Sequence, residues 1–337
     1  MKDRWLAVNL SLLLPGLGQF YLNQVLKGAG FVLGFITCLG WAVWSILAAN
    51  GNTVTGLWLV AIAATIYGFS LVDAHRGAQP VSIQSSKTKN VWYGVFLSQV
   101  LPGLGHLYLD RALIGGLFLI LGVGLALWAN TQSALIPLAC SVWAVATYHT
   151  FRSAARKVAT SLGLILLISL GLLFTRLTLG MAPVWFSQAV EQCIVPSESM
   201  LPTLKVSDRI FVRKAADDRP KTGDIVVFRI PKEAATLLRT SPDTLFVKRI
   251  IGLPGQQVQV SAGQVWINQQ PLAEPYGPMP VSYEWGPAII PKNTYFVLGD
   301  NRDASADSHV WGFLPAADLV GNAYKIYWPP SRIRPLN

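Results

Sequence analysis

The sequence predicts a multi-pass α-helical membrane region followed by a mostly β domain. Of the 337 residues, 52% are hydrophobic and only 13% are charged, whereas soluble domains carry about a quarter charged residues. Long apolar runs fill residues 1–180, and short runs separated by Pro and Gly follow from residue 181. This composition excludes a disordered chain and a collagen-like repeat, and three cysteines are too few for a disulfide scaffold.

Five apolar stretches are long enough to cross a membrane, because a hydrocarbon core of ~30 Å needs about 20 residues per helix. They are residues 29–49, 57–74, 113–129, 133–151 and 158–180. Two further apolar segments, 5–22 and 92–109, contain Pro-Gly-Leu-Gly near the middle, and these residues disfavour a continuous helix. We therefore expect five spanning helices and two segments that lie in the interface or re-enter. Crossing by both Pro-Gly segments is the alternative.

The two Pro-Gly segments begin an internal repeat. Leu14–Gly18 is identical to Leu101–Gly105, and further identical pairs follow at the same offset, 87 positions, without a gap. These pairs are Tyr21 with Tyr108, Leu22 with Leu109, Gly28 with Gly115, and Trp41 with Trp128. Such a series indicates a duplication, with a first membrane hairpin over residues 1–75 and a second over 92–152. The repeat resembles small bacterial membrane hairpins with a Gly-rich turn, which implies no chemistry.

The distribution of charge predicts the orientation. Residues 1–180 contain 11 Lys and Arg against 3 Asp and Glu, and the remainder contains 16 against 14. This basic excess lies at the ends of apolar runs, which favours contact with a lipid bilayer over nucleic acid. If five helices span the membrane, this basic excess lies on the cytoplasmic side. Residues 76–91 are then a basic cytoplasmic linker, 158–180 a transmembrane anchor, and 181–337 an extracytoplasmic domain.

Two consequences concern single segments of the membrane half. Because the N-terminus lies inside and no small-x-small cleavage site follows, residues 5–22 are not expected to be a cleaved signal peptide. Three histidines, His75, His106 and His149, fall near the inner helix ends. A metal site there is conceivable, but histidines at a membrane interface usually bind no metal, so no metal is assigned.

The half from residue 181 onward is predicted to be β-rich. Short β-type runs alternate with Pro and Gly turns over about 150 residues, which is typical of an all-β or mostly β domain. Ser261-Ala262-Gly263 between two of the runs predicts a hairpin. The expected strands are Arg209–Arg213, Asp224–Arg229, Leu245–Ile251, Gln257–Val260, Val265–Asn268, Thr294–Leu298 and Asn322–Trp328.

Ser199 and Lys248 are candidates for a catalytic pair. A serine hydroxyl is a weak nucleophile without a base, and this half has a single histidine, His309. A lysine can replace histidine if burial depresses its pKa. Strand alternation puts Lys248 on one face with Phe246 and Ile250, while Arg249 faces the other side, where it can meet a carboxylate. A solvated Lys-Arg pair is the alternative.

Four segments together resemble, in order and spacing, the conserved boxes of bacterial type I signal peptidases. They are Pro196–Leu204 with Asp208–Ile210; Gly223–Phe228; Lys248–Gly255; and Gly299–Asp303 with Ser305, Asp307, Ser308, Trp311 and Gly312. The resemblance covers about residues 158–330. It implies a signal-peptidase-type catalytic domain in a membrane-bound serine endopeptidase that removes signal peptides from exported preproteins and uses no cofactor.

The resemblance also implies residue roles. Ser199 attacks the peptide carbonyl and Lys248 is the general base. The Ser199 N–H and the Ser197 hydroxyl hold the oxyanion, and Ser305 orients the lysine. Structural ion pairs join Arg249 to Asp300 and Arg302 to Asp307.

Two positions depart from the family pattern, Ala304 where Asn is common and His309 where Arg is common. Because residues 256–293 are few, the accessory β-subdomain is expected to be reduced to a hairpin.

Two other interpretations stay open at this point. The chain could be a self-cleaving Ser/Lys protein of the same fold, or a membrane adaptor or transporter-like protein with an inactive outer domain. The main interpretation predicts signal-peptide-bearing preproteins and the lipid bilayer as partners, with the protein export machinery as a further candidate. It places the chain in the bacterial cytoplasmic (inner) membrane, and it predicts small residues at the first and third substrate positions before the cut.

Overall fold

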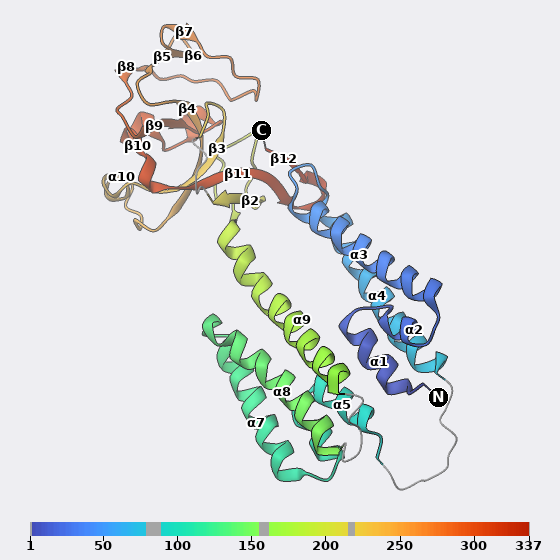
Figure 1. The fold of residues 1–337 in the computed structure, drawn as a ribbon. Coiled ribbons are helices and arrows are strands. Elements are labelled where there is room, and N and C mark those ends of the chain that lie inside the picture. Colours follow the sequence, from blue (N-terminus) through green and yellow to red (C-terminus); the bar gives the residue numbers. More distant parts are fainter. Residues whose placement is uncertain (1, 79–88, 155–161, 215–219, 337) are drawn as a thin grey trace. The chain divides into compact units, whose positions relative to one another are not determined.

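The computed structural model describes residues 2–78, 89–154, 162–214 and 220–336 (Figure 1). It divides into two compact units. The first comprises Met1–Val43 and Leu57–Phe186, and the second comprises Trp44–Gly56 and Ser187–Asn337. The residues that connect the two helices of the first predicted hairpin therefore belong to the second unit.

The first unit is helical. Its helices are α1 (Arg4–Leu13), α2 (Leu17–Tyr21), α3 (Val25–Leu47), α4 (Thr53–Gly77), α5 (Val91–Val100), α6 (Leu104–Tyr108), α7 (Ala112–Ala129), α8 (Ile136–Ala154) and α9 (Leu162–Ala189). By length and composition, five helical stretches among the described residues could cross a membrane: α3, α4, α7, α8 with the preceding turn, and α9. They coincide with the five expected runs. The anchor extends further than expected, to Ala189, and residues 158–161 lie outside the described part.

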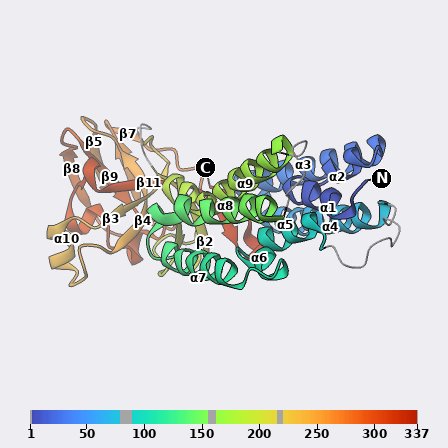
Figure 2. The ribbon, with the colours of Figure 1, turned by 60° about the horizontal axis from the view of Figure 1, so that its bottom comes forward.

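Both Pro-Gly segments interrupt a helix, and they do so in the same way. Gly16 and Gly103 have φ values of +104° and +97°, which side chains rarely adopt. A Cβ on Gly16 would lie 2.4 Å from the carbonyl oxygen of Gly28, and one on Gly103 would lie 2.1 Å from that of Gly115. The backbone thus turns back onto the next helix at both places, and only glycine permits that approach. The short helix α6 lies between α5 and α7 (Figure 2).

The equivalence extends to the residues before each segment. Asp3 and Asn90 cap α1 and α5 with their side chains. Their N–H groups donate to the hydroxyls of Tyr21 and Tyr108, at 3.1 Å in each case. Asn90 also donates to the Asp3 carboxylate at 2.9 Å. The two segments therefore share local geometry and contact each other.

The three histidines of this unit do not gather at one point. His106 and His149 are hydrogen-bonded to each other, with 2.8 Å between Nε2 and Nδ1. His75 packs against the ring of Trp5 at 5.1 Å. Within the described ranges, no group of three His, Cys, Asp or Glu side chains is placed to hold a metal ion.

The second unit contains two antiparallel sheets. The larger runs β1-β2-β11-β3-β4-β9-β10, with β12 paired to β11, and the smaller runs β7-β6-β5-β8. The strands are β1 (Val190–Ile194), β2 (Arg209–Lys214), β3 (Ile225–Arg229), β4 (Leu245–Gly252), β5 (Gln257–Ser261), β6 (Gln264–Ile267), β7 (Gln270–Pro271), β8 (Trp285–Ile289), β9 (Thr294–Leu298), β10 (Leu314–Pro315), β11 (Leu319–Trp328) and β12 (Arg334–Pro335). Short helices α10 (Lys232–Leu237) and α11 (Ser308–Trp311) join them.

Each of the seven expected runs forms a strand, and the predicted hairpin turn joins β5 to β6, with positive φ at Ala262 and Gly263. The expectation of a single hairpin over residues 256–293 is wrong, because this stretch builds a four-stranded sheet. Two strands of this stretch were missed: β7, which contains Pro271, and β8, which contains Gly286 and Pro287, and these residues disfavour strands. Both are edge strands, where a missing N–H donor is tolerated.

Candidate active site

Ser199 lies in the turn after β1, and contacts on both sides hold it. Its carbonyl oxygen accepts the Asn301 N–H at 3.1 Å, which ties it to the loop after β9. The next residues turn back through a bond from the Leu204 N–H to the Met200 carbonyl, 2.9 Å. Met200 and Leu204 are fully buried in the core beside β2 and β3. The packed core therefore fixes the position of the Ser199 hydroxyl.

Lys248 comes from β4 and meets Ser199 directly. Its Nζ lies 2.7 Å from the Oγ of Ser199, and the two residues are 2% and 6% exposed. The Phe246 ring lies 5.7 Å from Nζ, on the face that strand alternation predicts. Burial lowers the pKa of Lys248 to about 8, although the charges of Asp307 and Asp300 act in the opposite direction. A neutral amine beside the hydroxyl is therefore accessible near neutral pH.

The two other serines of the expected site are placed differently. The Ser197 hydroxyl donates to the Ser199 Oγ at 3.2 Å. Ser305 is buried, and its Oγ has no hydrogen-bond partner among the described residues. The backbone of Gly299 comes so close that a Cβ there would lie 2.3 Å from that Oγ and 2.4 Å from the Ser199 carbonyl oxygen. Ser305 thus adjoins the site without a hydrogen bond to Lys248.

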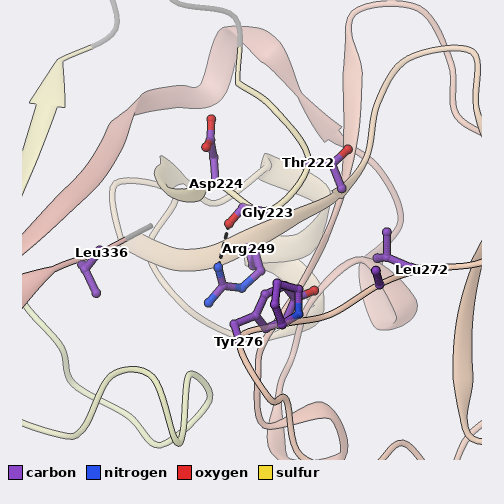
Figure 3. Close-up of a pocket in the computed structure, with 9 residues that line it drawn as sticks. Thr222, Gly223, Asp224, Arg249, Leu272, Tyr276 and Leu336 are labelled. Atoms are coloured by element: carbon purple, nitrogen blue, oxygen red, sulfur yellow. Dashed lines mark hydrogen bonds between the residues drawn. The ribbon is translucent and has the colours of Figure 1, made fainter.

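The expected pair of Arg249 and Asp300 is present and buried. Nε and Nη2 of Arg249 donate to the two carboxylate oxygens of Asp300 at 2.8 and 2.7 Å, and both side chains are at most 1% exposed. Such a two-pronged contact fixes orientation as well as charge. Nη1 donates to the Gly223 carbonyl oxygen at 2.6 Å (Figure 3). Because Arg249 follows Lys248, this pair also fixes the backbone that carries the lysine.

The expected pair of Arg302 and Asp307 is wrong. Arg302 pairs instead with Glu274, in the segment before β8. Asp307 caps α11, accepts the Gly299 N–H at 2.8 Å, and binds the His309 Nδ1 at 2.7 Å. A cap residue directs its carboxylate into its own helix turn, and this places it beside His309. No periodic signal in the sequence marks Glu274, which lies in an irregular segment.

Two of the hollows in this unit are lined by a neighbour of Lys248 in the sequence, Arg249 in one and Val247 in the other. One, of about 690 Å³, adjoins Arg249, whose guanidinium carbon lies 3.8 Å from the centre of the Tyr276 ring (Figure 3). Neither Ser199 nor Lys248 lines it. The other hollow, of about 340 Å³, is lined in part by residues that precede Ser199 and Lys248 in the sequence. Its lining is mostly apolar: Gln192, Cys193, Ile194, Val195, Pro196, Ile210, Val227, Leu245, Phe246 and Val247.

Comparison with known proteins gives a consistent result for this unit. The model of the family described as "Signal peptidase, peptidase S26" matches residues 169–328. A signal peptidase I of Leptolyngbya laminosa is 48% identical over 141 residues, which are 41% of this chain and 69% of that protein. The chain belongs to the signal peptidase I family.

Two further proteins are similar to part of the chain. The chloroplastic thylakoidal processing peptidase 1 of Arabidopsis thaliana is 37% identical over 164 residues, 48% of each chain. A crystal structure of a signal peptidase I from Enterococcus faecalis is 27% identical, covers 32% of this chain and 98% of its own, and has a TM-score of 0.25. As a member of the signal peptidase I family, the chain is a serine peptidase that removes signal peptides.

Proposed function

We propose that Ser199 and Lys248 carry out the cleavage as a nucleophile and its general base. The observation that carries this proposal is the 2.7 Å contact between Lys248 Nζ and Ser199 Oγ in a buried setting. Neutral Lys248 takes the hydroxyl proton as Oγ bonds to the scissile carbonyl carbon. The ammonium then returns the proton to the leaving amine of the mature protein, and water releases the acyl group with Lys248 again as base.

The developing oxyanion needs donors in place before the reaction. The Ser199 N–H and the Ser197 hydroxyl fit this role, because Ser197 already donates to the Ser199 Oγ at 3.2 Å and can turn to the adjacent carbonyl oxygen. Removing one such donor typically costs ~2.7–4 kcal/mol of transition-state stabilisation. Ser305 has a different role in this proposal, because its hydroxyl, without a hydrogen-bond partner in the described part of the chain, lies against Gly299 and completes the wall behind Ser199.

The apolar hollow beside Phe246 is the proposed substrate site. An extended peptide directs alternate side chains to the same side, so the first and third residues before the cut point into the protein together. Pro196 and Phe246 are among the residues that line this hollow and would contact the two side chains. This hollow, of about 340 Å³, would receive both side chains, and the expected preference for small residues at these two positions is tested with a matched substrate series.

We propose further that the chain spans the bacterial cytoplasmic membrane with its N-terminus inside and its peptidase unit outside. Five apolar helices and the basic excess of the first half support this orientation. The lipid bilayer and exported preproteins are then its partners, with the export machinery as a further candidate.

The decisive experiment uses the full chain purified in detergent and a preprotein with an Ala-x-Ala signal-peptide end. Mass spectrometry should find one new N-terminus directly after that sequence, and Ser199→Ala should yield none. Failure of the unaltered chain to cut would favour an inactive adaptor. Cleavage of the chain itself, with the preprotein left intact, would favour a self-cleaving protein.

Orientation is tested separately in intact cells. Cysteines introduced at Asn52 or Thr131, in a background without the native cysteines, should react with an impermeant maleimide. A cysteine at Ser153, or at Ser82 outside the described residues, should not react. Labelling of the Ser82 position from outside would mean that both Pro-Gly segments cross the bilayer.

A further inference from the structure

Lys325, on β11, is a buried cation that the active site does not use. Its register partners are Phe211 of β2 and Pro335 of β12, and its side chain is 0% exposed. Burying an ammonium group is very unfavourable unless hydrogen bonds replace the lost water. The contacts of Lys325 therefore need an explanation beyond those of an ordinary surface lysine.

Three backbone carbonyls surround the Lys325 ammonium. Its Nζ donates to the oxygens of Ser45, Ile46 and Ala48 at 3.0, 2.9 and 3.0 Å. An ammonium has three N–H donors, so each of them is used. These carbonyls lie at the C-terminal end of α3, where helix carbonyls lack partners within the helix and the helix dipole is negative. The lysine thus meets a site that matches it in both charge and donor number.

We propose that residues 44–56 form a docked part of the peptidase unit and that Lys325 is the residue that binds them. The surface of β11 and β12 is thus an intramolecular interaction surface, and its partner is the connection between the two helices of the first membrane hairpin. The contacts of Trp44–Gly56 place this connection in the second unit. Within this connection, Ser45 is 2% exposed and Gly51 is buried.

The docked connection is itself compact, as a binding element should be. The Gly51 N–H donates to the Ala48 carbonyl at 3.0 Å. A Cβ on Gly51 would lie 2.3 Å from the Ser45 carbonyl oxygen, which is one of the three that receive Lys325. Any side chain at Gly51 must therefore displace this carbonyl, and so the connection and the lysine are coupled.

The proposal assigns a structural task to the duplicated helical region. The chain passes between the two units at three points, on either side of residues 44–56 and again after Phe186. A peptidase unit joined only through α9 would be held by one covalent connection. Docking of residues 44–56 adds a non-covalent attachment, so the first hairpin acts as a tether of the peptidase unit.

The first test needs no variant. The folded full chain in detergent is treated briefly with an amine-reactive reagent, and mass spectrometry compares Lys325 with the exposed Lys292. Lys325 should react at least about tenfold more slowly, because it reacts only after local opening. Burial lowers the pKa of Lys325 to about 8, which by itself would make the amine more reactive, so slow reaction reports protection. Equal rates would overturn the proposal.

The second test displaces the connection and leaves the lysine intact. Gly51→Val should raise the labelling rate of Lys325 about tenfold or more, since losing one hydrogen bond to a charged group shifts a local opening by that order. Gly40→Val is the matched control, because no atom lies within 4 Å of a Cβ at Gly40. Unchanged protection in Gly51→Val would overturn the proposal.

The third test changes the lysine and measures the exposure of the connection. It also distinguishes the connection from a lipid phosphate as the partner of Lys325. A Ser45→Cys reporter in a background without the native cysteines should be protected from maleimide, and Lys325→Met should expose it, whereas Lys292→Met should not. All arms are run in detergent and in anionic vesicles. Protection of Lys325 that appears only in anionic vesicles would assign the lysine to lipid and refute the docked connection.

Discussion

Lys248 and Lys325 are both buried, but the groups that surround them differ. Burial lowers the pKa of both to about 8, so the pKa does not distinguish them. Lys248 meets a hydroxyl at 2.7 Å, whereas Lys325 meets three carbonyl oxygens. A hydroxyl can give up a proton and a carbonyl cannot. The partner, rather than the depressed pKa, therefore separates a candidate base from a structural cation.

The number of hydrogen-bond acceptors around each lysine also distinguishes the two sites. Three carbonyls accept the three N–H groups of the charged form of Lys325 and give the neutral amine a poorer fit. Among the described residues, the side-chain hydrogen bond of Lys248 is the one to Ser199, so fewer acceptors surround its charged form. This comparison makes four predictions, which follow in order of expected effect.

The largest effect is expected from removing the proton acceptor. Lys248→Met and Ser199→Ala should each lower kcat/KM by at least about 10³-fold with the fold intact, as removal of a catalytic nucleophile or base does. Lys248→Arg should fail equally, because a guanidinium keeps its proton. The measurement is preprotein cleavage by the purified full chain. In the same assay Lys325→Met should retain the chemical step, and equal inactivation of both lysine variants by a folded enzyme would contradict the comparison.

The pH dependence should follow Lys248 alone. Only the neutral amine can accept the Ser199 proton, so kcat/KM should rise about tenfold per pH unit below about 8 and level off above it. Between pH 6 and pH 8 this amounts to roughly 50-fold, because half of the amine is still protonated at its pKa. Lys325→Met should keep the same midpoint. A midpoint near ~10.4, the value of a free lysine, would show that burial does not activate Lys248.

The third prediction concerns the apolar hollow beside Phe246. A preprotein with alanine at the first position before the cut should be cleaved about 10–100-fold faster than one with leucine, because overpacking costs ~1–3 kcal/mol. Replacing the second residue should matter little. A matched preprotein series measures both effects, with Lys325→Met as a control that should preserve the ratio. Equal rates for alanine and leucine would remove the hollow from the proposed substrate site.

The smallest effect is expected at His309. This residue binds the Asp307 carboxylate at 2.7 Å and contacts neither Ser199 nor Lys248 by any described hydrogen bond. His309→Ala should change kcat/KM by no more than a few fold, since it removes a partner of Asp307 rather than a reacting group. Steady-state kinetics at pH 8 measures this. Loss of activity on the scale of Lys248→Met would point to a histidine base instead.

Local sequence patterns predicted much of this molecule. The five apolar helices, the seven strands and the breaks at Gly16 and Gly103 depend on hydrophobic periodicity and on backbone freedom, which neighbouring residues set. The pairing of Lys248 with Ser199 was predicted from short motifs of the outer half. Strand alternation then indicated which face of β4 carries the lysine and which carries Arg249.

Only the tertiary structure decided the partners that lie far apart along the chain. Arg302 binds Glu274 rather than Asp307, residues 256–293 form a sheet of four strands, and Lys325 meets Ser45 some 280 positions away. No local pattern marks such contacts, because they depend on strand register and on the path of irregular segments. Sequence alone thus determined the long helices, seven of the strands and which residues are candidates for the reaction. The packing of those elements determined that one buried lysine meets a hydroxyl while the other meets a ring of carbonyls.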